Sequence, residues 1–439
     1  MNEDILADSG EFERAYLVGI QVGRTPRAEV EEHLDELASL VETMGAVTVG
    51  REVVRVQALN AKFLVGEGKI EEIKAWAEAA EADLIVVDDD ISSAQQNAWE
   101  KAIKKAVIDR RKVILDIFAQ RAMTREARLQ TQLASLQYQL PRLKRAWTHL
   151  ERQRGGRGFI GGSGEAQIET DRRIVRDKIA KLREELQEVR NTRESQRKAR
   201  RMRPVPNAAI VGYTNSGKSS LLNALTAANV LQEDKLFATL DPTTRRVELP
   251  NNQPLLLTDT VGFIRKLPTT LVEAFKSTLE EAQLADFLIH VVDVSHPQCH
   301  DHIRTTNEVL KELDALEKPT LLVLNKCDRL EETWGLLAQF EEYADKVVLT
   351  SATEGTGLQL MVEHLAGFLA SELRNVFLRL PASRYDLISE VHREAEVLDK
   401  GFDEEGNTLL YASFPQRFFY KVEPYVVADW RSGEIATLE

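Results

Sequence analysis

An eight-residue segment in the middle of the chain constrains its fold more than any other feature. Residues 212–219 read Gly-Tyr-Thr-Asn-Ser-Gly-Lys-Ser; they follow an apolar run at 208–211 and precede an apolar repeat with helical spacing. Between a strand and a helix, such a loop encloses phosphate with its backbone N–H groups. Lys218 is expected to reach the terminal phosphates, and the Ser219 hydroxyl can ligate Mg²⁺. The candidate nucleotide ligands are Gly212, Tyr213, Thr214, Asn215, Ser216, Gly217, Lys218 and Ser219.

The composition is that of a globular protein with unevenly distributed charge. At 439 residues the chain can hold about three or four domains. Its two cysteines cannot form a disulfide framework, its start is not a basic segment followed by an apolar core, and no apolar run could span a membrane. We therefore expect a cytoplasmic monomer, with peripheral membrane association left open. Residues 142–203 carry 19 Lys and Arg against 9 Asp and Glu, in a chain of net charge −13, which suggests one local contact with a polyanion.

Strand and helix patterns alternate in the first quarter of the chain. Apolar runs typical of buried strands occur at 16–20, 53–56, 84–87 and 113–116. Segments with helical spacing lie between them, and the alternation predicts a small parallel α/β domain over residues 1–117. The Gly-Glu-Gly-Lys sequence at 66–69 could be a second phosphate site, but it lacks the full spacing and is better interpreted as a strand-to-helix turn.

A heptad pattern runs through the next part of the chain. Its two series are Leu129, Leu133, Leu136, Leu140, Leu143, Trp147 and Leu150, then Ile168, Val175, Ile179, Leu182, Leu186 and Val189. Two such helices, joined by a Gly-rich break at 155–164, predict a long antiparallel helical hairpin over residues 118–203. A first helix from about 119 to 153 would be roughly 50 Å long, with a kink at Pro141.

The Gly-rich break would lie at the tip of this arm. Its glycines allow close approach of the backbone to a partner, and Arg157 and Phe159 offer charge and a stacking surface. Structured RNA is the partner that fits this chemistry. The alternative interpretation is a solvated coiled-coil hairpin whose loop only turns the chain.

Residues 204–372 contain strand candidates separated by helical stretches, and polar motifs follow the strands. Asp259, Thr260, Val261 and Gly262 form the first motif. The Asp259 carboxylate can hold Mg²⁺ through water, and the Gly262 N–H can approach a γ-phosphate. Thr260 and Val261 are more simply structural. Ahead of this motif lie Phe237, Ala238, Thr239, Leu240 and Asp241, continuing to Thr244. One threonine here should reach Mg²⁺ in the triphosphate state, and the spacing does not choose between Thr239 and Thr243.

A second group of motifs indicates which base is bound. Asn325, Lys326, Cys327 and Asp328 follow another apolar run. The Asp328 carboxylate can accept two hydrogen bonds from guanine, whereas adenine offers no matching pair. Ser351, Ala352 and Thr353 fit the loop that covers the base. All of these motifs follow predicted strands and occur in the order typical of GTPases. Together they predict a doubly wound, Ras-like GTPase domain that binds GTP.

Two residues bear on hydrolysis. Phe263 occupies the position where Ras-like GTPases have a glutamine that orients water, so we expect slow intrinsic hydrolysis that a partner stimulates. Asn215 resembles the asparagine of GTPases that use a monovalent cation, which raises the hypothesis of K⁺ dependence. The candidate catalytic residues are Lys218, Thr239 and Gly262.

Two remaining segments carry weaker signals. His296, Cys299, His300 and His302 could suggest a metal site, but a polar surface turn is the simpler interpretation. Residues 373–439 hold strand-like runs at 376–380, 409–412 and 418–422 and a helical stretch at 385–398, which predict a small α+β domain of undetermined role.

The whole chain resembles the HflX family of translational GTPases. The resemblance is carried by the break at 155–164 with the following residues to 173, by 115–122, and by 237–241 ahead of 259–262. The break has Gly-Ser-Gly at 162–164 where Gly-Pro-Gly is common in the family, and Ala166 stands where Thr is usual. These differences affect only local loop stiffness.

The resemblance implies a GTPase that binds the large (50S) ribosomal subunit and its rRNA through residues 142–203 and splits stalled ribosomes under stress. It also implies Ser219, Thr239 and, through water, Asp259 as the Mg²⁺ site, with Thr239 preferred over Thr243. Two other functions stay open: a ribosome-assembly or RNA-chaperoning GTPase, and a nucleotide-gated scaffold whose hairpin binds another protein.

Overall fold

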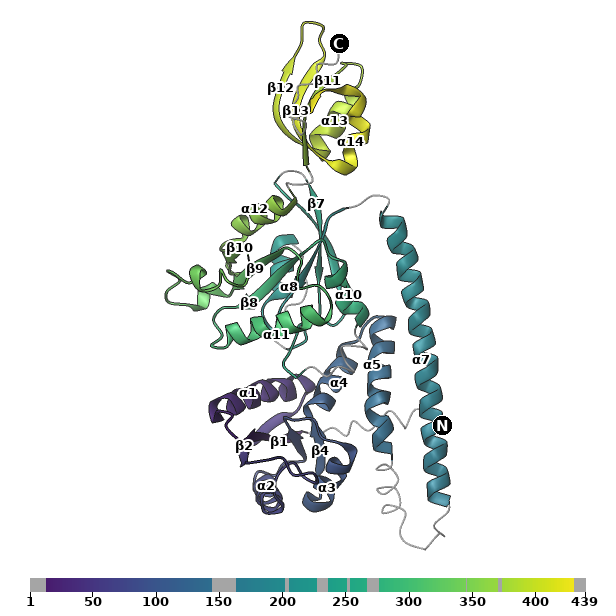
Figure 1. Ribbon diagram of the computed structural model, residues 1–439, viewed down its shortest axis with the longest axis vertical. Coiled ribbons are helices and arrows are strands. Elements are labelled where there is room, and N and C mark those ends of the chain that lie inside the picture. The colour runs from purple at the N-terminus through teal and green to yellow at the C-terminus, as the bar shows by residue number, and fades with distance from the viewer. Residues whose placement is uncertain are drawn as a thin grey trace. The chain divides into compact units, whose positions relative to one another are not determined.

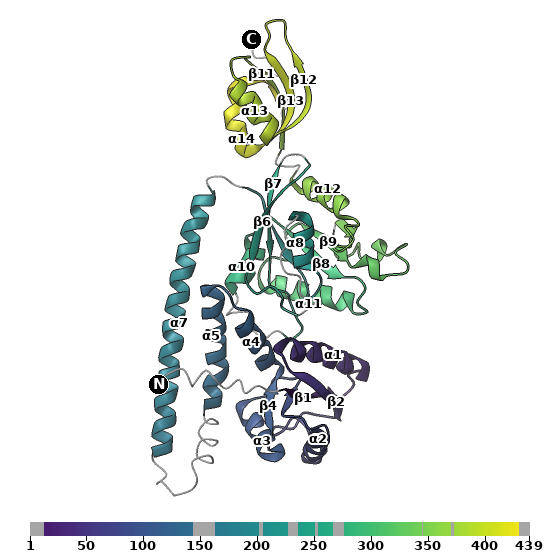
Figure 2. The same ribbon diagram turned by 180° about the vertical axis from the view of Figure 1, so that it is seen from behind.

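The computed structural model contains two compact units (Figures 1 and 2). The first comprises Met1–Asn191, Glu233–Asp241 and Lys266–Lys276, and the second comprises Thr192–Gln232, Pro242–Arg265 and Ser277–Glu439. The structure describes residues 13–143, 163–201, 205–226, 236–250, 253–266, 276–344, 346–369 and 373–429. The predicted multidomain α/β class is confirmed, and each unit is described by itself.

A four-stranded parallel sheet forms the core of the first unit. Its order is β2-β1-β3-β4, with β1 at Arg14–Val22, β2 at Val47–Val56, β3 at Leu84–Val87 and β4 at Ala106–Asp109. Helices connect the strands as parallel pairing requires: α1 at Arg27–Met44, α2 at Glu67–Ala79 and α3 at Ser93–Ile103. All four residues of β3 are buried, as a strand covered on both faces should be.

The fourth predicted strand, at 113–116, is wrong. These residues lie in helix α4, Arg110–Arg121, and the strand β4 ends just before it. The Asp109 side chain accepts a hydrogen bond from the Lys112 N–H and caps the helix. Because α4 is buried on more than one side, its apolar residues form a continuous run that has no clear helical period.

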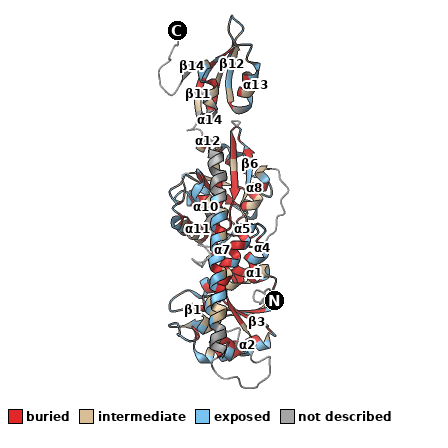
Figure 3. Cartoon of the chain, turned by 90° about the vertical axis from the view of Figure 1, so that its right-hand side faces the viewer, coloured by how far each residue is buried: buried red, intermediate tan, exposed pale blue. Residues whose placement is uncertain are grey.

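The predicted antiparallel hairpin is present in the first unit. Helices α5, Arg125–Gln139, and α7, Ser163–Arg201, pack through a shared cluster: Leu129, Leu133, Leu136, Val175, Ile179 and Leu186. Buried, intermediate and exposed residues alternate along α7 (Figure 3). The cluster consists of residues from the two predicted heptad series.

The predicted bounds of the first hairpin helix need correction. The chain leaves helical geometry at Ala122, and the Thr124 side chain caps α5, so no single helix runs from 119. Pro141 lies in a short 3₁₀ turn, Leu140–Arg142, that ends α5, because proline cannot donate to the preceding turn. Residues 144–162, which include most of the predicted tip, lie outside the described residues; Ser163 and Gly164 begin α7.

The second unit contains a six-stranded sheet. Its order is β10-β9-β8-β5-β7-β6, and all neighbours pair in parallel except β6 and β7. The strands are β5 at Asn207–Val211, β6 at Thr243–Glu248, β7 at Pro254–Asp259, β8 at Phe287–Asp293, β9 at Thr320–Asn325 and β10 at Lys346–Leu349. The helices are α8 at Lys218–Thr226, α10 at Lys276–Leu284, α11 at Cys299–Glu312 and α12 at Leu358–Leu369. Strands β7 and β8 lie on opposite sides of β5, so the carboxyl ends of β5, β7 and β8 form a topological switch point, the place where ligands bind in such sheets.

A separate four-stranded antiparallel sheet follows in the second unit. Its elements are β11 at Leu373–Leu380, α13 at Tyr385–Glu394, β12 at Glu396–Phe402, β13 at Thr408–Pro415, α14 at Gln416–Val422 and β14 at Val426–Asp429. The strand predicted at 418–422 is wrong, because these residues belong to α14. A five-residue apolar run cannot be assigned to strand or helix by periodicity alone.

A buried ion-pair network lies at the carboxyl end of β3. The Arg110 side chain is 2% exposed and pairs with Glu36 and with Asp88, at 2.8 Å from the Asp88 carboxylate. Lys266 Nζ also lies 2.7 Å from Asp88. Such networks are costly to break, because Glu36 and Asp88 would lose the buried cation that they share.

We predict that Arg110→Ala destabilises the first unit by about 3–5 kcal/mol. Hydrogen exchange at the buried amides of β3 measures this free energy directly. The control is Arg111→Ala, which removes the partly exposed ion pair with Asp90 and should cost no more than about 1 kcal/mol. Equal effects of the two substitutions would contradict the burial argument.

Candidate nucleotide-binding site

The loop between β5 and α8 has the backbone geometry of a phosphate-binding loop. Gly212 and Gly217 have φ angles of 146° and 94°. A Cβ on Gly212 would lie 2.2 Å from the Val291 carbonyl oxygen, and one on Gly217 would lie 2.2 Å from the amide nitrogen of Asn325. Only glycine fits either position, so the two glycines of the motif are required by both conformation and space.

Lys218 is buried in this loop. Its Nζ donates hydrogen bonds to the carbonyl oxygens of Gly212, at 3.2 Å, and Tyr213, at 2.8 Å. Burial lowers the pKa of Lys218 to about 8, and the neighbouring Asp259 carboxylate offsets only part of this effect. Phosphate oxygens would replace the two neutral carbonyl acceptors with negatively charged ones.

Two side chains with oxygen ligands lie in contact next to Lys218. The Ser219 hydroxyl donates to the Asp259 carboxylate at 2.7 Å, and Asp259, at the end of β7, is 1% exposed. Hydroxyl and carboxylate oxygens are the donors that Mg²⁺ prefers. The pair therefore fits the predicted metal site. Thr260 instead donates its hydroxyl to the Ile210 carbonyl, as expected for a structural residue.

The segment after Asp259 lies directly against the phosphate loop. The Thr214 N–H donates to the Phe263 carbonyl at 2.7 Å, and the Phe263 N–H donates to the Gly212 carbonyl at 3.1 Å. A Cβ on Gly262 would lie 2.7 Å from the backbone Cα of Thr214, so Gly262 needs to be glycine. The Phe263 side chain is 1% exposed and packs in the core.

The structure assigns a role to Tyr213 that the motif did not indicate. Its hydroxyl accepts a hydrogen bond from the Arg265 N–H at 2.9 Å, and its ring stacks on His302, with centroids 3.8 Å apart and planes 7° apart. Burial lowers the pKa of His302 to about 3, so this imidazole stays neutral. The interpretation of 296–302 as a polar surface turn is therefore wrong: Cys299 and His302 are buried on α11.

The predicted base-recognition motifs lie together beside the phosphate loop. The Asn325 amide donates to the Ser216 carbonyl at 3.0 Å and accepts from the Ala352 N–H at 3.1 Å. Lys326 Nζ donates to the Asn215 carbonyl at 2.8 Å. Asp328 is exposed in a short 3₁₀ turn, where its carboxylate is accessible to a ligand.

The 351–353 loop has its own polar contact. The Ser351 and Thr353 hydroxyls are hydrogen-bonded at 3.0 Å, and Ser351 is fully buried. This contact fixes the turn that follows β10, next to Ala352.

Residues 236–241 belong to the first unit, whereas the phosphate loop belongs to the second. The Phe237 side chain is 2% exposed and packs edge to face on Phe118, with centroids 4.8 Å apart. The Asp241 carboxylate accepts from the N–H groups of Met123 and Thr124 at 3.0 and 3.1 Å. The assignment of Thr239 to Mg²⁺ stays a prediction.

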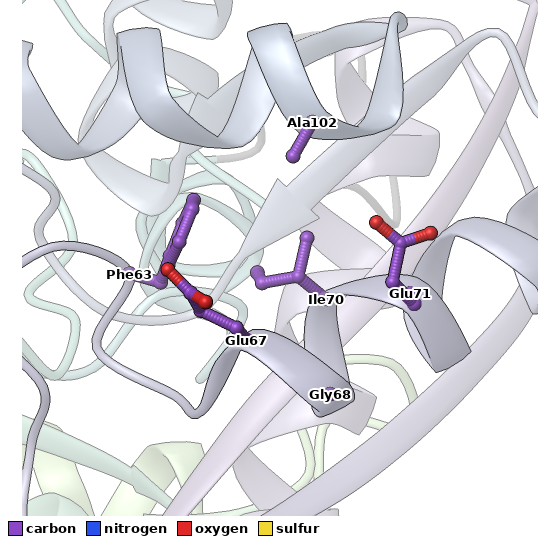
Figure 4. A pocket seen from close by; sticks show the side chains of 6 residues that line it. All are labelled: Phe63, Glu67, Gly68, Ile70, Glu71 and Ala102. Atoms are coloured by element: carbon purple, nitrogen blue, oxygen red, sulfur yellow. The ribbon is translucent and has the colours of Figure 1, made fainter.

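Carboxylates lie beside the Gly-rich turn at 66–69. An open depression of 310 Å³ adjoins it, lined by Phe63, Glu67, Gly68, Ile70, Glu71 and Ala102 (Figure 4). The two glutamates would repel a phosphate. This result favours the strand-to-helix turn, with Gly66 preceding α2 in an extended conformation.

Among the described residues, no group of three or more His, Cys, Asp or Glu side chains could hold a metal ion. No helix among them is long and apolar enough to cross a membrane.

The sheet, the phosphate loop and the ordered motifs define a P-loop GTPase. Family models match three consecutive regions: a GTP-binding GTPase N-terminal region at 31–119, its middle region at 121–200 and a 50S ribosome-binding GTPase at 207–326. The GTPase HflX of Akkermansia muciniphila is 47% identical and aligns with 94% of this chain and 97% of its own length. That of Escherichia coli K12 is 41% identical over 91% of both chains. The chain belongs to the HflX GTPase family and is a GTP-hydrolysing enzyme.

One solved structure is similar over much of the chain. A GTP-binding protein from the archaeon Sulfolobus solfataricus, in complex with GDP, is 26% identical and covers 82% of this chain and 99% of its own, with a TM-score of 0.44.

The low pKa of Lys218 predicts that GTP affinity falls at alkaline pH. Only the protonated amine pairs with phosphate, so above pH 8 binding must take up a proton, and affinity should fall up to about tenfold for each further pH unit. Calorimetric titration between pH 7 and 9 measures both affinity and proton uptake. Lys218→Arg, which stays protonated, should bind without this pH dependence. A constant affinity across the range would contradict the prediction.

Proposed function

We propose that this GTPase acts on the large ribosomal subunit and splits stalled ribosomes under stress. The observation that carries the proposal is the match of residues 207–326 to a 50S ribosome-binding GTPase, in a chain that also has a basic helical hairpin. The hairpin helices bury their leucines against each other, so the charged side chains of the arm stay available to RNA phosphates.

Nucleotide binding follows from the loop geometry. Lys218 contacts the terminal phosphates, and Asp328 reads guanine while Asn325 holds the surrounding loops together. Ser219 and, through water, Asp259 would hold Mg²⁺ by their oxygen atoms. The ion, when bound, neutralises charge on the β- and γ-phosphates. Gly262 lies next to Lys218, and its N–H is the proposed donor to the γ-phosphate.

Hydrolysis needs a group other than the Phe263 side chain to position the attacking water. Since that side chain is buried, the attacking water is positioned by backbone groups or by a partner, and the intrinsic rate is slow. Asn215 is exposed and has a φ of 58° at the outer turn of the phosphate loop. Its side-chain oxygen is available to a monovalent cation that neutralises transition-state charge.

We predict that K⁺ accelerates GTP turnover relative to Na⁺ and that Asn215→Asp changes this dependence. Aspartate tolerates the left-handed backbone of Asn215 as asparagine does, so the loop should stay folded. Initial rates in matched KCl and NaCl, with GDP affinity as the control for folding, measure the effect. Identical turnover of the unmodified chain in the two salts would contradict cation dependence.

The ribosomal proposal predicts that large subunits stimulate GTP turnover and that the arm tip is required. The double variant Gly161→Glu, Gly162→Glu adds bulk and negative charge to the predicted tip, and should lose most of the stimulation while keeping GTP affinity. Turnover is measured with and without purified subunits, followed by a subunit-splitting assay on intact ribosomes.

Three results would redirect the proposal. Binding only to precursor particles would favour an assembly function. RNase-resistant binding through the arm would favour a protein scaffold. If the unmodified chain and the tip variant both bind GTP and large subunits stimulate neither, the ribosomal function is wrong.

A further inference from the structure

The sheet at the end of the chain has one face covered by helices and one face open. Its elements follow the order β-α-β-β-α-β, and the strands lie in the order β12-β13-β11-β14. Helices α13 and α14 lie on the same side of the sheet (Figures 1 and 2). The buried cluster on that side includes Val376, Leu378, Leu410, Ala412 and Val391. Because side chains alternate along a strand, the residues between these point to the other face.

The open face carries large apolar side chains on its two central strands. Phe377 on β11 is directly opposite Tyr411 on β13, and their rings stack with centroids 4.3 Å apart. Leu409 lies two residues before Tyr411 on the same face. Phe377 is 44% exposed and Leu409 is 37% exposed. We refer to Phe377, Leu409 and Tyr411 as the aromatic face; an exposed apolar group of this kind is typical of a binding surface.

The charge around the aromatic face is negative. Asp399 on β12 is directly opposite Tyr411 and is exposed. Arg379, the cation next to Phe377 on this face, is already paired with Asp403 at 2.7 Å and Glu405 at 2.8 Å. Residues 373–439 carry 12 Asp and Glu against 8 Lys and Arg.

This charge decides between two partners. RNA-binding modules also place aromatic residues on the central strands of a four-stranded sheet, where they stack on bases. RNA, however, needs cations for its phosphates, and the excess here is of carboxylates. A positively charged protein surface fits both the apolar centre and its acidic surroundings.

We propose that the aromatic face binds a basic protein surface of the large ribosomal subunit. An apolar or aromatic side chain of the partner packs on Phe377 and Tyr411, while its lysines or arginines pair with Asp399. The inference rests on the proposed ribosomal function. It adds a protein contact, distinct from the RNA contact of the arm.

The test compares the affinity of full-length variants for purified large subunits, with a non-hydrolysable GTP analogue bound. Phe377→Ser combined with Tyr411→Ser should weaken binding by about tenfold or more, because such apolar anchors dominate interfaces. The control is Tyr385→Ser on α13, which removes an aromatic side chain that is 74% exposed and outside the aromatic face. It should leave the affinity unchanged. Thermal unfolding and GTP affinity check that each variant is folded.

Asp399→Lys distinguishes the partners. It should weaken binding several-fold to a basic protein but strengthen binding to RNA. A benzophenone crosslinker placed by Leu409→benzoylphenylalanine should then attach to a subunit protein. Crosslinks to rRNA, to a second copy of this chain or to its own residues 430–439 would overturn the inference, as would unchanged affinity of the double variant. If the unmodified chain does not bind subunits, the ribosomal function itself fails, and this inference fails with it.

Discussion

The side-chain amide of Asn325 is the contact on which the nucleotide site depends. Its nitrogen donates to the Ser216 carbonyl in the phosphate loop, and its oxygen accepts the Ala352 N–H in the base loop. Three loops that are far apart in sequence are thereby joined by one residue that is 1% exposed. Aspartate has no N–H donor, so it could not make both contacts. A buried amide with both ends satisfied fixes the positions of these loops relative to one another.

The phosphate loop and the segment that follows Gly262 form a second rigid connection. Backbone hydrogen bonds join Gly212 and Thr214 to Phe263, and the Tyr213 hydroxyl adds a third contact at Arg265. The side chain after Gly262 is thus used for packing rather than for orienting water. A GTPase built in this way keeps its phosphate contacts while its rate depends on groups outside this position. Control of hydrolysis by a binding partner follows naturally from that arrangement.

Segments whose backbone or burial restricts the choice of residue could be predicted from the sequence, and the others could not. The phosphate loop was predictable because only glycine tolerates the backbone and close contacts at 212 and 217. The buried strands of the second unit were also evident, since they are apolar runs between helices.

The polar edge strand β6 was missed: four of its six residues are Thr or Arg, and it lacks the apolar pattern of a buried strand. The 113–116 and 418–422 errors share one cause, which is that short apolar runs have no readable period. The stacking of Tyr213 on His302 joins residues 89 positions apart and could not be read from local sequence. The domain bounds and the catalytic assignments stay predictions.

The charge distribution restricts how this chain can use a ribosomal surface. With a net charge of −13, the chain as a whole is repelled by RNA, so the RNA contact of the proposed function must come from a segment where cations are concentrated. Residues 142–203 provide this segment, and the heptad packing of α5 and α7 keeps its charges on a stiff support. The acidic sheet at residues 373–429 cannot compete for the same phosphates. A ribosome presents both phosphates and basic protein surfaces, and a chain with separated charges of opposite sign is suited to bind both, each by the part of matching charge.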